Sequence, residues 1–314
     1  MKDSAVAVIA GGLSFEREVS LRSGRRVADA LRERGFIVSE LDADSQLVEL
    51  LQAGDYDAAF LALHGRFGED GTVAGLLELL GLPYTGSGVD ASRLAFDKLA
   101  AKSVLRRAGL PVPDAIPLAE GALRELGLGA LLDRAVEQLG LPLVVKPNRG
   151  GSALGIRLVE RADQLPAALM SAFGYDDTVL LERRVSGTEL ALAVVDGHPP
   201  LPAVEIRPKA GWYDFAARYT HGAADFLAPA PLDAEVTERC LAIARAAHLA
   251  LGCRDISRVD AILDQDGTCW VLEVNTGPGL TSTSLVPMAA DAAGIAFADL
   301  AAHLTNRAIA RRPR

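Results

Sequence analysis

The chain has 314 residues, which is enough for about two domains and for a buried hydrophobic core. It carries 32 basic and 41 acidic side chains, a net charge of −9 that disfavours general nucleic-acid binding. Three cysteines without a CxxC pair argue against a disulfide framework or a thiolate zinc site and fit the cytoplasm. No apolar stretch reaches the roughly 18 residues that span a bilayer, and no export signal is recognisable, so no membrane partner is expected.

The first third of the chain alternates short apolar strands with amphipathic helices. Strands are expected at 5–10, 36–41, 58–63 and 82–84, and helices at 16–34, 46–51 and 72–80. This alternation predicts a parallel sheet covered on both faces, with ligands binding beyond the carboxyl ends of its strands. The loops 11–15 and 64–71 are therefore the expected binding loops.

The remaining chain changes pattern after one long expected helix at 90–107, which has Asp90 as its N-cap and Lys98 in its interior. Locally paired strands then alternate with helices. The strands are expected at 143–146, 155–159, 178–185, 189–195, 203–206, 257–263 and 270–274, and the helices at 130–139, 162–173 and 233–251. Residues 207–225 form a long irregular segment, which in a compact protein is usually functional or disordered. The predicted fold class is α/β, with α+β character in the C-terminal half.

The most informative polar pattern lies on the last two expected strands. Alternation places Arg258 and Asp260 on one face, and Glu273 and Asn275 on the matching face of the neighbouring strand. Two carboxylates and an amide oxygen beside an arginine suit Mg²⁺, which prefers oxygen ligands. An ordinary solvated sheet face with cross-strand charge pairs explains the same pattern, and both interpretations stay open at this point.

A second pattern is a strand ending at Lys146 followed by the glycine-rich turn 149–155. Glycines let backbone N–H groups approach phosphate oxygens, and a lysine adds a positive charge. The turn is not a Walker loop, because GK[ST] is absent and a strand follows it; a flexible hairpin is the simpler alternative. Glu182, at the end of an apolar run, and Glu189 are suited to an adenine and ribose pocket, or to a surface strand.

Other polar positions allow more than one interpretation. Glu16 lies in the first turn of the first helix, where it either complements the helix dipole or binds a substrate ammonium group. A lone His64 is more typical of a structural role, and a lone Lys98 of a solvated charge. The aromatic cluster at 212–219 is most simply the local packing of a long loop.

The ordered motifs resemble those of the D-alanine–D-alanine ligases of the ATP-grasp superfamily over nearly the whole chain. They are GGLSFEREVSLRSG, ALHGRFGEDGT, PYTGSG with FDK, VVKPNRGGSALGI, LLERRVSGTE, WYDFAARYT, and SRVDAIL with LEVNTGPGLTSTSLVPMA. The resemblance implies an N-terminal preATP-grasp domain at 1–95, a central ATP-grasp subdomain at 96–185 and a C-terminal subdomain at 186–314. It also implies a cytoplasmic homodimer that makes the peptidoglycan dipeptide from D-alanine and ATP with two Mg²⁺ or Mn²⁺.

The resemblance also implies roles for the residues that match these motifs. ATP would be bound by Lys98, Lys146, Gly151, Ser152, Glu182, Val185, Glu189 and Arg218. The metal ligands would be Asp260, Glu273 and Asn275, with Glu273 bridging the two ions. The residues implied to bind substrate or act in catalysis are Glu16, His64, Ser152, Tyr219, Arg258, Gly279, Ser284 and Leu285.

Within that last group the implied contacts differ. Glu16 would take the ammonium group of the first D-alanine, and the carboxylate of the second would bind at Ser284 and Leu285. The oxyanion would be stabilised by Arg258 with the backbone N–H of Gly279. A hydrogen-bond chain would join Glu16 to Ser152 and Tyr219 and close the long loop.

Some positions depart from the commonest family pattern without removing a metal ligand: Gly150, Ala153, Arg218 and Gly277. Two other functions stay open, a ligase that takes D-lactate or D-serine as its second substrate and a non-catalytic nucleotide-binding homologue. The complete set of implied metal ligands argues against the latter. Tyr219 stands where lactate-type ligases carry a histidine, and a neutral tyrosine does not repel the D-alanine ammonium group.

Overall fold

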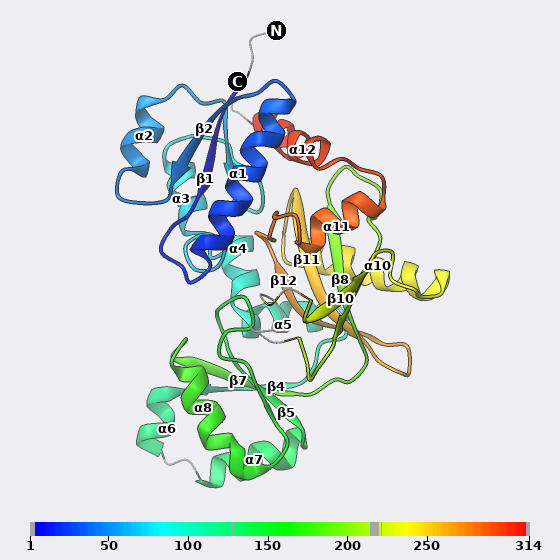
Figure 1. The fold of residues 1–314 in the computed structure, drawn as a ribbon. Helices are drawn as coiled ribbons and strands as arrows, with labels where there is room; N and C mark the ends of the chain where they lie inside the picture. Colours follow the sequence, from blue (N-terminus) through cyan, green and yellow to red (C-terminus); the bar gives the residue numbers. More distant parts are fainter. Residues whose placement is uncertain (1–3, 127–128, 214–219, 221, 312–314) are drawn as a thin grey trace.

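The computed structural model describes residues 4–126, 129–213, 220 and 222–311. Its strands form three sheets, which succeed one another along the chain from the blue to the orange regions of Figure 1. The sheet nearest the N-terminus is parallel and the other two are antiparallel, so the predicted α/β class with an α+β C-terminal half is confirmed.

The parallel sheet has the order β2-β1-β3, and the alternation of strands and helices predicted it. Its elements are β1 (Ala5–Ala10), α1 (Arg17–Glu33), β2 (Ile37–Asp42), α2 (Leu47–Ala53), β3 (Ala58–Leu61) and α3 (Thr72–Leu79). β1 is buried because it is the central strand, which is why its sequence is a short apolar run. The expected strand at 82–84 is reduced to a single bridge between Ala59 and Tyr84.

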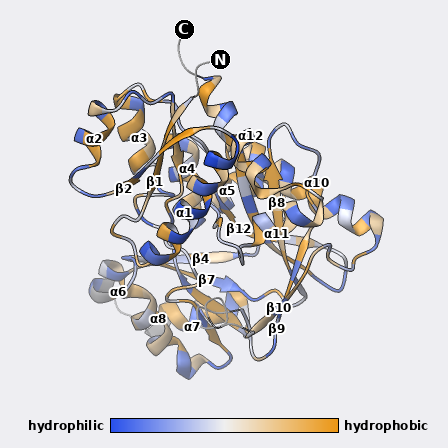
Figure 2. Cartoon of the chain, turned by 45° about the horizontal axis from the view of Figure 1, so that its top comes forward, coloured by the Kyte–Doolittle hydropathy of each residue, from blue (hydrophilic) through white to orange (hydrophobic). Residues whose placement is uncertain are grey.

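The helix α1 covers this sheet with one apolar face. Val27 and Leu31, one turn apart, are fully buried, whereas charged residues occupy the exposed side. Figure 2 shows this division as alternating hydrophobic and hydrophilic colours along α1. The helix is therefore held by packing against β1, and its first turn lies at the carboxyl end of that strand.

The single long helix expected at 90–107 is two helices, and that prediction was wrong. α4 (Val89–Phe96) follows Gly88 as its N-cap, and α5 (Lys98–Arg107) begins one residue after α4 ends. The break lies at Asp97, whose extended backbone lets its side chain accept a hydrogen bond from the N–H of Ala100. Lys98 is therefore the first residue of a helix, not an interior one.

The central antiparallel sheet has the order β4-β7-β5-β6. Its elements are β4 (Ala115–Ala119), α6 (Glu120–Leu126), α7 (Gly129–Leu139), β5 (Leu143–Pro147), β6 (Arg157–Val159), η1 (Ala162–Gln164), α8 (Leu165–Phe173) and β7 (Thr178–Arg183). The sequence analysis did not predict β4, which contains Pro117. A proline is tolerated there because β4 is an edge strand that pairs with β7 alone in this sheet.

The C-terminal antiparallel sheet has the order β10-β9-β8-β11-β12. Its elements are β8 (Thr188–Val195), β9 (Val204–Pro208), β10 (Ala224–Leu227), α10 (Ala234–Ala250), β11 (Ile256–Leu263) and β12 (Cys269–Asn275), followed by α11 (Leu285–Ala292) and α12 (Phe297–Ile309). The segment expected to be irregular at 207–225 has strand at both ends, because β9 reaches Pro208 and pairs with β10. Its positions 214–219 and 221, with the aromatic cluster's second half, lie outside the described residues.

Buried clusters join parts of the chain that are far apart in sequence. Leu300 and Leu304 of α12 pack in one cluster with Val6 and Phe60 of the parallel sheet, and α12 lies beside α1 in Figure 1. Leu105 of α5 packs instead in the cluster of the C-terminal sheet. The cluster of the C-terminal sheet contains residues from both sides of the boundary predicted at residue 95. The domain boundaries at residues 95 and 185 therefore stay predictions.

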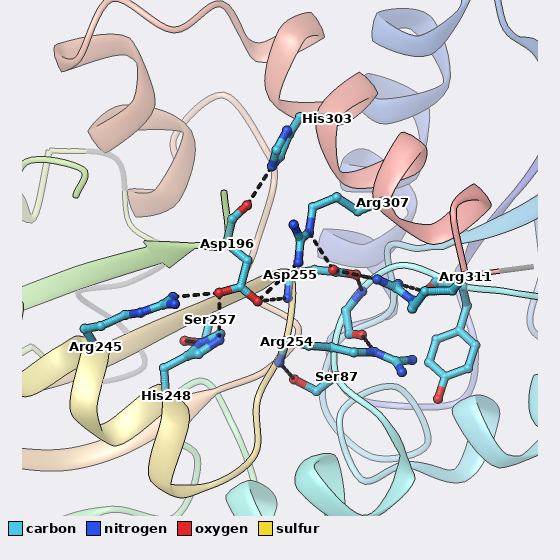
Figure 3. A network of polar contacts seen from close by, with 12 residues as sticks. Ser87, Asp196, Arg245, His248, Arg254, Asp255, Ser257, His303, Arg307 and Arg311 are labelled. Atoms are coloured by element: carbon cyan, nitrogen blue, oxygen red, sulfur yellow. Dashed lines mark hydrogen bonds and ion pairs between the residues drawn. The ribbon is translucent and has the colours of Figure 1, made fainter. Parts of the chain in front are cut away.

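A buried polar network reinforces the same junction (Figure 3). Asp255, just before β11, is fully buried, and its carboxylate accepts hydrogen bonds from the backbone N–H of Gly86 at 2.9 Å and from Arg307 at 3.0 Å. Arg311 donates to both carboxylate oxygens and to the carbonyl of Tyr84. The network thus ties α12 and the 84–86 loop to the start of β11.

The three cysteines, Cys240, Cys253 and Cys269, are buried and free. No single helix among the described residues is long and apolar enough to cross a membrane, and α11 with α12 reaches that length only as a pair bent by 109°.

Candidate active site

The polar faces of β11 and β12 meet as the alternation predicted. In the register of the two strands Arg258 lies opposite Asn275, and Asp260 lies opposite Glu273. Arg258 holds Asp260 through two hydrogen bonds of 2.6 and 2.8 Å, and the amide of Asn275 donates to the same carboxylate at 3.2 Å. The four side chains therefore form one cluster.

Groups of opposite charge meet in this largely buried cluster. Burial alone would lower the pKa of Arg258, but the carboxylates of Asp260, Glu273 and Glu69 outweigh it and raise that pKa. Lys98 approaches from α5, with its Nζ 3.4 Å from a carboxylate oxygen of Glu273. Each carboxylate thus faces a cation. The donor set, two carboxylates and an amide, suits a hard divalent cation.

The described residues contain no group of three or more His, Cys, Asp and Glu side chains that could hold a metal ion. The candidate set of Asp260, Glu273 and Asn275 has two such members, and its third donor is an amide. The observation therefore leaves the predicted metal role of these residues as a prediction.

Beside the cluster lies a cavity of about 570 Å³ between the central and C-terminal sheets. Both sheets contribute to its wall. The predicted site residues that line it are Lys146, Glu182, Val185, Glu189, Asp260 and Glu273. A cavity of this size is suited to a small organic ligand such as a nucleotide. The structure brings the two patterns recognised separately in the sequence to opposite walls of one site.

The wall on the side of the central sheet contains a buried ion triad. Lys146 donates to Oε1 of Glu182 at 2.8 Å, and Lys102 of α5 lies 2.7 Å from Oε2 of the same residue. Burial would raise the pKa of Glu182, but the two lysines outweigh it and lower that pKa. Lys102 was not among the predicted site residues, although its spacing of four residues from Lys98 places both on one face of α5.

The glycine-rich turn closes over the site from the central sheet. The Ser152 hydroxyl donates a hydrogen bond to the carboxylate of Glu16, which ends the loop after β1. Gly65 and Gly151 lie so near this carboxylate that an added Cβ would come within 2.2 and 3.0 Å of it, respectively. The Lys98 Nζ donates to the carbonyl of Gly150 at 2.7 Å. Glu16 thus lies between the glycine-rich turn and the expected binding loop at 64–71.

His64 is buried and already has hydrogen-bond partners at both ring nitrogens. Its Nδ1 lies 2.9 Å from the carbonyl of Gly277, which only accepts, so Nδ1 carries the proton and Nε2 accepts from Ser23 at 2.9 Å. Burial lowers the pKa of His64 to about 4, which keeps the ring neutral. The predicted substrate contact of His64 would have to displace one of these bonds.

Glu69, a buried carboxyl group in the same loop as His64, was not among the predicted site residues. Burial, with the charge of Glu16 second, raises the pKa of Glu69 well above its ordinary value. Its carboxyl accepts a hydrogen bond from the N–H of Gly65 at 3.2 Å. Glu69 lay within the motif ALHGRFGEDGT, but nothing in its spacing distinguished it from the neighbouring Asp70.

The helix α11 follows β12 along the chain. Ser284 is its N-cap residue and accepts a hydrogen bond from the N–H of Thr281 at 3.0 Å, and Leu285 is the first helical residue. A Cβ added at Gly279 would lie 2.8 Å from the Ser284 hydroxyl, so these two residues are neighbours. Helix N-termini favour anions because their first N–H groups have no partner within the helix. The predicted residues Arg218 and Tyr219 lie outside the described residues.

Comparison with known proteins agrees with this geometry. The sequence profile described as D-ala D-ala ligase C-terminus matches residues 104–306, and the one described as D-ala D-ala ligase N-terminus matches residues 39–87. The D-alanine–D-alanine ligase of Geobacter sulfurreducens is 45% identical over 96% of this chain and 92% of its own length. The ligase of Desulforudis audaxviator is 47% identical over 96% and 98% of the two chains.

Solved structures give the same result. The D-alanine–D-alanine ligase of Bacillus anthracis superposes with a TM-score of 0.85 at 36% identity over 98% of both chains, and its complex with ATP superposes with 0.83 at 35%. The VanG D-Ala:D-Ser ligase of Enterococcus faecalis superposes with 0.84 at 29% identity over 97% and 99% of the chains. The profiles, the full-length identity and the fold agree, and this chain belongs to the D-alanine–D-alanine ligase family.

Proposed function

We propose that this protein joins two molecules of D-alanine into D-alanyl-D-alanine, with conversion of ATP to ADP and phosphate, as a step in making peptidoglycan precursors. The observation that carries the proposal is the cavity between the two antiparallel sheets, with Lys146 on one wall and Asp260 and Glu273 on the other. Its relatives at 42–47% identity, which are named for this reaction, support the same activity.

The chemistry explains why ATP is needed. A carboxylate is a poor electrophile, so a carboxylate oxygen of the first D-alanine attacks the γ-phosphorus of ATP and displaces ADP. The amine of the second D-alanine then attacks the acyl carbon of the resulting acyl phosphate. Phosphate leaves as the amide forms, and the amine loses its proton. Such a sequence depends on positioning and electrostatic stabilisation, and it needs no side-chain nucleophile.

In this proposal the two antiparallel sheets hold ATP. Lys98, Lys146 and the glycine-rich turn bind the phosphates, since lysines supply positive charge and glycines allow close approach of backbone N–H groups. Lys146 and Ala153 line the cavity, and Lys98 lies beside it at Glu273. The adenine and ribose lie next to Glu182 of the central sheet, Val185, and Glu189 of β8 in the C-terminal sheet, which all line the cavity. Arg218 adds a further charge from the closing loop.

The residues Asp260, Glu273 and Asn275 would hold two Mg²⁺ or Mn²⁺ ions. When bound, these ions neutralise charge on the transferring phosphoryl group. The fit rests on the donor set of two carboxylates and an amide. Arg258 and Lys98 already contact the two carboxylates at 2.6 and 3.4 Å, so bound ions would have to share or displace these contacts.

The amino-acid substrates bind between Glu16 and the start of α11. Glu16 takes the ammonium group of the first D-alanine, and the N-terminus of α11 at Ser284 and Leu285 takes the carboxylate of the second. Arg258 and the N–H of Gly279 stabilise the oxyanion of the tetrahedral intermediate. The contact between Glu16 and Ser152 supports a closed turn that excludes water from the acyl phosphate, and Tyr219 completes this closure.

A ligase with another second substrate is the other candidate, because a D-Ala:D-Ser ligase has nearly the same fold. The higher identity to D-alanine–D-alanine ligases and the neutral Tyr219 favour D-alanine. We also propose that the protein is a cytoplasmic homodimer with domains at 1–95, 96–185 and 186–314. Size-exclusion chromatography with light scattering would measure the dimer directly.

Release of phosphate tests the enzymatic activity. The protein is incubated with Mg²⁺ and ATP, with and without D-alanine, and phosphate is measured over time. We expect release to require D-alanine. ATP binding without any D-alanine-dependent phosphate release would instead indicate a nucleotide-binding homologue.

A further inference from the structure

The ion triad beside the cavity contains one charge that the proposed reaction does not use. Lys146 and Glu182 line the cavity, whereas Lys102 reaches Glu182 from α5 and is not among the described lining residues. The exposed fractions of the three side chains are 6, 4 and 3% for Lys146, Glu182 and Lys102. Water therefore screens these charges little, and each influences the others strongly.

The net charge of the triad influences how strongly this wall of the cavity attracts a phosphate group. Lys146 and Glu182 alone form a neutral pair, in which the lysine is bound to a carboxylate 2.8 Å away. With Lys102 the triad carries a net charge of +1. Because Lys102 binds the second carboxylate oxygen, Lys146 can turn toward a phosphate without leaving a buried carboxylate uncompensated.

We propose that Lys102 is a positioning residue for ATP, which neutralises Glu182 and so leaves the positive charge of Lys146 available to the phosphate groups. The inference rests on the proposed role of the cavity as the ATP site. In this proposal Lys102 touches neither ATP nor the amino acids. Two lysines on one face of α5 then have different roles. Lys98 serves the phosphate end and the turn directly, and Lys102 acts through Glu182.

The pH dependence of ATP binding follows from the surroundings of Lys102. Burial lowers the pKa of Lys102 to about 8, against the opposing effect of Glu182. The other charged groups that act on it are Lys146 of β5 and Arg106 of α5, and the carbonyl of Pro113 lies 3.5 Å from its Nζ. As the pH rises through about 8, Lys102 loses its proton and the triad its net charge, so ATP should bind more weakly.

The experiment measures ATP binding by equilibrium dialysis without D-alanine, and the KM values and kcat of the ligation reaction separately. We expect Lys102→Met to raise the Kd and KM for ATP roughly 10- to 100-fold. The KM for D-alanine and the kcat at saturating ATP should stay within about threefold, because the residue acts on phosphate binding alone. The double variant Lys102→Met/Glu182→Gln should regain part of the ATP affinity, since no uncompensated carboxylate then holds Lys146.

The matched control is Arg106→Gln. Arg106 lies one turn further along α5, is exposed at its ion pair with Asp114, and carries the same charge. Its loss should change the ATP Kd by no more than about twofold. In Lys102→Arg the guanidinium keeps its proton over the whole range, so the loss of ATP affinity of the wild type between pH 7 and 9.5 should be reduced.

Several results would overturn the inference. One is a folded Lys102→Met protein with unchanged ATP affinity; another is an equal loss for ATP and D-alanine with no recovery in the double variant, which would indicate a merely structural role. If Lys102→Met does not fold, the pH profiles decide, and a wild-type ATP Kd that is constant from pH 7 to 9.5 contradicts the proposal. Because dialysis needs no ligation, failure of the proposed reaction is recognised independently.

Discussion

Substitutions at Asp255 can separate two effects on stability, the loss of a buried charge and the strain of the backbone at this residue. Asp255 is fully buried and has a φ of 63°, in the left-handed region that L-residues other than glycine seldom adopt. Its carboxylate accepts hydrogen bonds from Gly86, Arg307 and Arg311 (Figure 3). Two substitutions remove the carboxylate alike but differ at the backbone, Asp255→Ala and Asp255→Gly.

The magnitude follows from burial and from the partners. Loss of one member of a buried ion pair typically costs 3–5 kcal/mol because the other charge stays unpaired. Here the arginines are 35 and 29% exposed and can regain water, so we expect Asp255→Ala to lower the free energy of unfolding by about 2–4 kcal/mol. Glycine is not strained at positive φ, so Asp255→Gly should be about 1 kcal/mol more stable than Asp255→Ala.

Equilibrium unfolding in urea, followed by circular dichroism at pH 7, measures both differences. The exposed pair of Arg134 and Glu137 provides a control, since Arg134→Ala should change stability by less than about 0.5 kcal/mol. An Asp255→Ala protein as stable as the wild type would refute the stabilising role of the network. Equal stability of the alanine and glycine variants would refute the argument from backbone strain.

Three other predictions concern the site. Asp260→Asn or Glu273→Gln should abolish turnover in a protein that still folds, because a metal-binding charge is lost; turnover near the wild-type rate at saturating Mg²⁺ would contradict the metal assignment. Glu16→Gln should raise the KM for the first D-alanine by roughly 10- to 100-fold and that for ATP much less, since a charge-assisted hydrogen bond is worth about 1.5–3 kcal/mol; equal losses would indicate a structural role. Because the pKa of His64 is about 4 in the folded protein and near 6.5 when unfolded, the stability it contributes is present above pH 6.5 and falls as the pH drops toward 4. His64→Asn should flatten this fall between pH 7 and 5, and an identical pH dependence in variant and wild type would show that His64 does not cause it.

The sequence predicted best those features that depend on local periodicity. β1 is a short buried run, and the alternation along β11 and β12 placed Arg258, Asp260, Glu273 and Asn275 together, because neighbouring antiparallel strands carry a period of two on matching faces. The family resemblance added the order of the motifs. Together they pointed to residues that line both walls of the cavity, Lys146 and Glu182 on one and Asp260 and Glu273 on the other.

What the sequence could not predict depends on contacts that are distant along the chain. The break at Asp97 is invisible to helical periodicity, since α4 and α5 are each helical and only the side-chain cap at Asp97 separates them. Lys102 meets Glu182 across 80 positions, and no spacing rule connects a helix residue to a strand that far away. The alanine-rich helix α12 was not predicted from its sequence pattern, yet its buried residues pack against the parallel sheet in one core cluster.

The identity of the product tests the central claim most directly. The protein is incubated at pH 7 with ATP, Mg²⁺ and equal concentrations of D-alanine, D-serine and D-lactate, and the joined products are identified by mass spectrometry. The account predicts D-alanyl-D-alanine as the main product, formed in step with ADP. A mainly D-alanyl-D-serine or D-alanyl-D-lactate product would contradict the assignment of the second substrate, and ADP formation without any joined product would contradict the ligase itself.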